Sequence, residues 1–118
     1  MKVCVSASIK FKDQILEVSQ CLSEQNIACV VPEMDISKDM ELDEMVPDLV
    51  YRHFKKIRES DAVLVVNPDG YIGNSVKVEI GYAKGLGKKV YFLEKTNAPE
   101  LDCLADEILE ANKFDVFR

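Results

Sequence analysis

The fold class is decided by the run Ala62-Val63-Leu64-Val65-Val66, which is apolar at every position and lies between polar residues. A strand without polar alternation is typical of the centre of a parallel sheet, where helices cover both faces. Three further short runs of apolar and β-branched residues, at positions 2–5, 27–31 and 90–93, predict additional strands.

Apolar residues at helical spacing separate these strands. The predicted helices cover residues 11–22, 49–60 and 75–86, and a last helix runs from 101 to 108 before a short edge strand at 114–117. Strands that alternate with helices form a parallel sheet with right-handed crossovers. We therefore expect one α/β domain over residues 1–118: a doubly wound sheet of four to five parallel strands with helices on both faces.

Composition excludes several classes of protein. The 118 residues carry a net charge of −6, which disfavours a nucleic-acid polymer as partner because such binding depends on a basic face. No apolar stretch approaches the roughly 20 residues that cross a bilayer, and the first residues are too polar for a signal peptide. The four cysteines form no C-x-x-C pair and there is one histidine, so we expect reduced cysteines, no metal, no organic cofactor and a cytoplasmic location.

Three loops follow the carboxyl ends of the predicted strands, at residues 6–10, 32–47 and 67–74. Doubly wound sheets bind their ligands at these ends, where the strand order reverses. Residues 33–48 contain seven acidic residues and one lysine, and this long segment is either a lid over the site or a solvated acidic loop.

The loop after the central strand is the most informative segment. It contains Gly70 and Gly73, which permit close approach of the backbone, and Asn74 or Ser75 can cap the helix that follows. Free N–H groups at such a helix start form an anion site. The alternative is an ordinary capped turn between strand and helix.

Glu79 is the candidate reactive residue. It lies about 60° from Val76 around the predicted helix, at the edge of the apolar stripe, and just over one turn from the strand end. A carboxylate there can serve as a nucleophile or as an acid or base, and the alternative is a salt bridge to a neighbouring loop. Ser6 and Ser8 can donate hydrogen bonds to a phosphate, while the position of His53 predicts a half-exposed helix residue.

A family resemblance emerges from these segments. Residues 60–67, Asp69-Gly70, Glu79-Ile80-Gly81-Tyr82-Ala83 and residues 87–90 resemble the nucleoside 2-deoxyribosyltransferase family, and most closely a branch of small relatives with a Gly-Tyr-Ile-Gly loop. The resemblance covers about a third of the chain, from residue 53 to 93. It implies a flavodoxin-like fold and a homodimer or larger homo-oligomer.

The resemblance also implies an activity on a nucleoside or nucleotide, namely cleavage or transfer at the N-glycosidic bond. Glu79 would be the nucleophile that attacks the anomeric carbon of the sugar. The remaining residues would bind substrate. Gly73, Asn74 and Ser75 would bind a 5′-phosphate or sugar hydroxyl, and Asp69, beside Gly70, would contact the sugar or base. Ser6 and Ser8 would line the wall of the crevice, and His53 would bond the base or leaving group. The alternative function is a non-catalytic nucleotide-binding or sensing module on the same fold.

Overall fold

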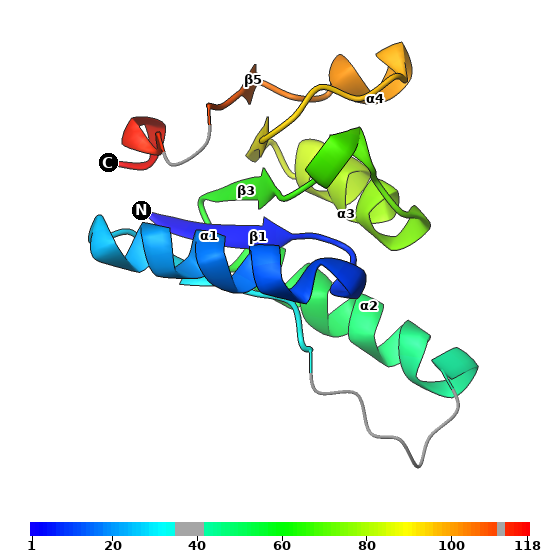
Figure 1. The fold of residues 1–118 in the computed structure, drawn as a ribbon. Coiled ribbons are helices and arrows are strands. Elements are labelled where there is room, and N and C mark those ends of the chain that lie inside the picture. Colours follow the sequence, from blue (N-terminus) through cyan, green and yellow to red (C-terminus); the bar gives the residue numbers. More distant parts are fainter. Residues whose placement is uncertain (35–41, 111–112) are drawn as a thin grey trace.

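A computed structural model describes residues 1–34, 42–110 and 113–118, and it contains a five-stranded parallel sheet flanked by helices (Figure 1). The strand order is β2-β1-β3-β4-β5, which is the flavodoxin-like order. The strands are β1 (Lys2–Ser6), β2 (Ala28–Val30), β3 (Ala62–Val65), β4 (Lys89–Phe92) and β5 (Glu107–Ile108). The predicted α/β fold class is confirmed, with five strands.

Strands β1 and β3 form the centre of the sheet because both of their faces are apolar. Their register pairs Val3 with Ala62 and Ser6 with Val65, so both strands end at the same edge. All four residues of β3 are buried. Val63 and Val65 pack on one face of the sheet and Leu64 on the other, as strand alternation requires.

Helices cover the two faces unequally. Helix α1 (Lys12–Glu24) packs with the short C-terminal turn η3 (Asp115–Phe117) on one face, while α2 (Leu42–Arg58) and α3 (Asn74–Gly85) pack together on the other. Figure 1 shows α1 in front of β1, and α2 and α3 pack on the opposite face of the sheet. The one-turn α4 (Pro99–Asp102) precedes β5.

Two predicted elements near the C-terminus are wrong. The helix predicted to reach Ile108 ends at Asp102, because the chain beyond it pairs with β4 through Asp106 N–H to Val90 C=O at 2.7 Å. The predicted edge strand at 114–117 is a 3-10 turn. Phe114 and Phe117 are both buried on the same side of the core, which a spacing of three residues allows in a helical turn but not in a strand.

The N-terminus of α2 also differs from the prediction. The helix begins at Leu42, seven residues before the predicted start, and contains Pro47, which the sequence pattern placed ahead of it. Residues 42–48 of the predicted acidic loop therefore belong to α2, and residues 35–41 lie outside the described residues.

Asp106 anchors the edge of the sheet. Its carboxylate accepts hydrogen bonds from the Val90 N–H at 2.8 Å and the Lys84 ammonium at 3.0 Å. Burial works to raise the pKa of this carboxyl, but these two bonds and the charges of Lys84 and Lys89 outweigh it and hold the pKa below its ordinary value. The side chain thus joins α3, β4 and the start of β5.

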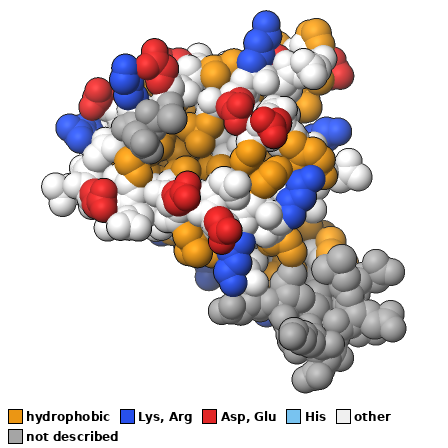
Figure 2. Space-filling view, in the orientation of Figure 1, with side chains coloured by type: hydrophobic (Ala, Val, Ile, Leu, Met, Phe, Trp, Pro, Cys, Tyr) orange, Lys and Arg blue, Asp and Glu red, His pale blue; other side chains and the backbone are white. Residues whose placement is uncertain are grey.

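Charges of both signs lie on the face of the molecule that carries α1. Figure 2 shows acidic, basic and hydrophobic side chains interspersed on the face that carries α1. Within the part of the chain that the structure describes, no helix combines the length and apolar character that a membrane span requires.

Candidate active site

A cavity of about 310 Å³ opens at the carboxyl ends of β1 and β2, between α2 and the start of α3. This volume suits a small organic ligand. Its described lining residues come from four segments: Ala7, Ser8 and Ile9; Pro32 and Glu33; Val46, Leu49, Val50, Arg52, His53 and Lys56; and Tyr71, Gly73, Asn74, Ser75, Val76 and Glu79.

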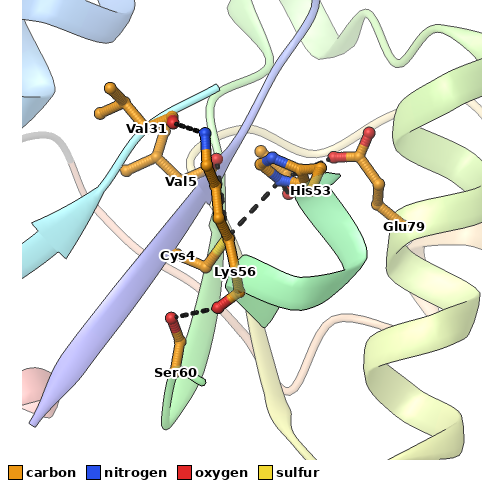
Figure 3. A network of polar contacts seen from close by, with 8 residues as sticks. Cys4, Val5, Val31, His53, Lys56, Ser60 and Glu79 are labelled. Atoms are coloured by element: carbon orange, nitrogen blue, oxygen red, sulfur yellow. Dashed lines mark hydrogen bonds and ion pairs between the residues drawn. The ribbon is translucent and has the colours of Figure 1, made fainter. Parts of the chain in front are cut away.

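Glu79 faces this cavity from the second turn of α3. Val76, Ile80 and Ala83 form the buried stripe of the helix, and Glu79 lies at its edge with 7% of its surface exposed. Its Oε1 is 3.0 Å from the Nε2 of His53 on α2. Figure 3 shows the two side chains pointing toward each other across the gap between the helices.

His53 is buried, with 6% of its surface exposed, so the prediction of a half-exposed residue is wrong. Its Nε2 lies 2.9 Å from the Ser6 Oγ and 3.5 Å from the Cys4 Sγ as well as beside Glu79. All three partners surround the Nε2, so this buried ring nitrogen has hydrogen-bonding groups around it. When Glu79 is ionised, its carboxylate only accepts, and the bond to it then requires the hydrogen of the ring on Nε2.

Ser6 and Cys4 support the histidine from β1. Ser6 is fully buried and contacts His53, whereas the resemblance placed it on the crevice wall. Burial, together with the negative charge of Glu79, raises the pKa of the Cys4 thiol to about 12. Cys4 therefore stays a neutral thiol and acts as a small packing residue.

The start of α3 forms the opposite wall of the cavity. Gly73, Asn74 and Ser75 all line it, and the N-cap residue Gly73 has no side chain to occupy the free N–H groups. Ser8 lines the cavity from the loop after β1. These amides and hydroxyls can bind an anionic or hydroxylated end of a ligand.

Asp69 and Gly70, two of the predicted site residues, do not line this cavity. They line a second, more open depression with Lys10, Thr96 and other residues, while Tyr71 borders both hollows. The Asp69 N–H donates to the Glu94 carboxylate at 2.9 Å, which holds this turn against the loop after β4.

Asn67 fixes the same pair of loops. Its fully buried amide donates to the Glu94 carbonyl at 2.7 Å and accepts from the Glu94 N–H at 3.0 Å. A Cβ on Gly70 would lie 2.7 Å from the Lys95 carbonyl oxygen, so only glycine fits this contact, at a φ of +76°. The loop that leads into α3 is therefore held on the β4 side.

Sequence reasoning missed three polar residues of the cavity wall. Lys56 donates to the Val31 carbonyl at 2.9 Å, a bond visible in Figure 3, and Arg52 bonds Glu33 at 3.0 Å. Arg52 and Lys56 lie on the same side of α2 as His53, but this spacing was obscured by the apolar stripe of the helix, and Glu33 lies in the loop after β2. In the described residues, no cluster of three or more His, Cys, Asp and Glu side chains could hold a metal ion.

Comparisons with known proteins bear on the fold. No family model matches the chain, and no curated protein matches its sequence. Among solved structures, the 2-deoxyribosyltransferase of the psychrotolerant bacterium Bacillus psychrosaccharolyticus matches 95% of this chain and 88% of its own, with a TM-score of 0.72 and 13% identity. The chain shares its fold with this enzyme.

This likeness agrees with the resemblance seen in the sequence and with the flavodoxin-like strand order. In this chain, the cavity lies at the carboxyl ends of the strands, where doubly wound sheets bind their ligands. At this level of identity, the activity of the chain has to be argued from its own side chains.

Proposed function

We propose that this chain cleaves, or transfers at, the N-glycosidic bond of a nucleoside or nucleoside 5′-monophosphate, with Glu79 as the nucleophile. One observation carries the proposal: a buried carboxylate faces a cavity of ligand size and is held at 3.0 Å by a buried histidine. The shared 2-deoxyribosyltransferase fold supports it.

The proposed reaction has two displacements at the anomeric carbon. His53 bonds Oε1 of Glu79, so we assign the attack to Oε2. Oε2 forms an ester bond to the sugar while the C–N bond breaks, and the base leaves with that electron pair and takes up a proton from solvent. Water or a second base then attacks the anomeric carbon and loses a proton to solvent, while the ester bond breaks and releases the Glu79 carboxylate.

The walls of the cavity suggest how the substrate is oriented. The helix start at Gly73, Asn74 and Ser75, with Ser8 nearby in the lining, would bind a 5′-phosphate or hydroxyl of the sugar. The contact between Asp69 and the substrate, which the resemblance implied, has no support from the geometry because Asp69 lines the other depression.

The test is release of free base from a panel of ribo- and deoxyribonucleosides and their 5′-monophosphates, measured by chromatography. Glu79→Gln keeps the shape of the side chain and should reduce release on the order of a thousandfold or more. Glu59→Gln, at an exposed position just after α2, is the matched control and should retain activity. No release by the wild type, with equal nucleotide binding by wild type and Glu79→Gln, would refute the enzyme and leave the nucleotide-binding module.

A further inference from the structure

Lys56 is the only lysine or arginine of the described cavity lining without a carboxylate partner. Its Nζ donates to the Val31 carbonyl at 2.9 Å, and Figure 3 shows the extended side chain that makes this bond. Arg52, by contrast, lies 3.0 Å from Glu33 and 2.7 Å from Asp48. The bond to a neutral carbonyl uses one of the three hydrogens of the Lys56 ammonium group, so two remain for a ligand.

The position of this ammonium group places it opposite the start of α3. Val31 directly follows β2, and β2 is two positions from β3 in the sheet. The loops after these two strands therefore leave the sheet about 10 Å apart. The loop after β3 leads to the helix start at Gly73 and to Glu79. A nucleotide whose sugar phosphate lies at that helix start can extend its base toward Lys56.

The cavity also offers apolar surface for the two faces of a planar base. Pro32 comes directly after Val31, and Val46, Leu49 and Val50 line the cavity from α2. Apolar walls with a few polar groups that fix orientation are the usual composition of a site for a small organic molecule. The base thus has apolar walls for its faces and an ammonium group for its edge.

We propose that Lys56 selects a 6-oxopurine, such as hypoxanthine or guanine, as the base of the substrate. This inference rests on the proposed function, because that function places a base in the cavity. An ammonium group can only donate hydrogen bonds, and a 6-oxopurine presents two adjacent acceptors, O6 and N7. Adenine has an amino group in place of O6, and its hydrogens would face those of Lys56.

The test compares the binding of inosine 5′-monophosphate and adenosine 5′-monophosphate, whose purines differ only around C6. Calorimetry on Glu79→Gln protein avoids turnover of the ligand, and the 2′-deoxy forms of both nucleotides are measured alongside. The inosine nucleotide should bind more tightly than the adenosine nucleotide, on the order of tenfold to a hundredfold.

Two substitutions of Lys56, each added to Glu79→Gln, separate the charge from the rest of the site. Lys56→Met removes the ammonium group and keeps an unbranched side chain, so the two nucleotides should bind almost equally. Lys56→Gln supplies both a donor and an acceptor, which suit N7 and the amino group of adenine, and should favour the adenosine nucleotide. Lys55→Gln, at an exposed position outside the cavity lining, is the matched control and should leave the preference unchanged. Circular dichroism verifies that each variant folds.

The outcomes distinguish this inference from the proposed function. Equal binding of the two nucleotides when Lys56 is present, or a preference that survives both Lys56→Met and Lys56→Gln, would overturn the inference. Equal weakening of both nucleotides by Lys56→Met would place the phosphate at Lys56 and would overturn it too. Base release by the wild type is measured separately. The expected preference without base release would refute the enzyme and retain the selection of the base, whereas base release without the preference would do the reverse.

Discussion

The contact between His53 and Glu79 should be measurable as a coupling free energy of about 2 kcal/mol in a double-mutant cycle. Both side chains are more than nine-tenths buried, and the bond between them is charge-assisted at 3.0 Å. His53→Ala strands the Glu79 carboxylate away from water and should lower the free energy of unfolding by about 3 kcal/mol. Glu79→Ala leaves the histidine bonded to Ser6 and should cost only about 1 kcal/mol.

The informative comparison is with the double variant. It contains no stranded carboxylate, so it should be more stable than His53→Ala alone, by about 1 kcal/mol. Urea denaturation at one protein concentration, followed by circular dichroism because the chain has no tryptophan, measures all four proteins. If the single effects add within about 0.5 kcal/mol, the two side chains are not coupled and the reasoning about the site fails.

Three further predictions concern other parts of the molecule. Asp106→Ala should lower the free energy of unfolding by about 2 kcal/mol at neutral pH. The pKa of Asp106 in the folded state lies below its unfolded value of about 4. The stabilisation is therefore complete above the unfolded pKa and is lost as the pH falls through the folded pKa. Urea titrations in which wild type and variant differ in stability by the same amount at neutral pH and at about pH 2 would contradict this. Gly70→Ala and Gly87→Ala both place a side chain at φ +76°, but only Gly70 also has a carbonyl oxygen 2.7 Å away, so its variant should lose at least about 1 kcal/mol more in denaturation. In the native protein, a thiol reagent should modify exposed Cys103 and leave Cys4, whose pKa is raised to about 12, untouched until the chain unfolds; rapid labelling of Cys4 would show that β1 opens readily.

Local sequence signals were sufficient for most of the fold. The all-apolar run of β3 and the helical stripe of α3 each depend on burial that repeats along the chain, so pattern alone located them within a residue or two. Strand β5 could not be located in this way, because its two residues are extended only through pairing with β4. The start of α2 was missed because a proline usually marks the first turn of a helix, and here Pro47 lies inside it.

Residues of the candidate site could likewise be predicted where a local pattern marks them. Glu79 was found because its own helix places it at the edge of a buried stripe. The burial of His53 could not be predicted from the sequence, because its partners Ser6 and Glu79 lie 47 and 26 positions away along the chain and contact it only in the folded protein. Asp69 depends likewise on Glu94, a residue in a loop that the local pattern of residues 67–75 does not report.

The cavity lining has a consequence for how this chain can be altered. Every described residue of the lining lies between positions 7 and 79. Residues 89–110 and 113–118 are about a quarter of the chain and contain β4, β5 and the C-terminal turn. They contribute to the sheet edge and to the core on both faces of the sheet instead. Substitutions there can be selected for thermal tolerance or expression, and those before position 80 for choice of ligand, with little conflict between the two searches.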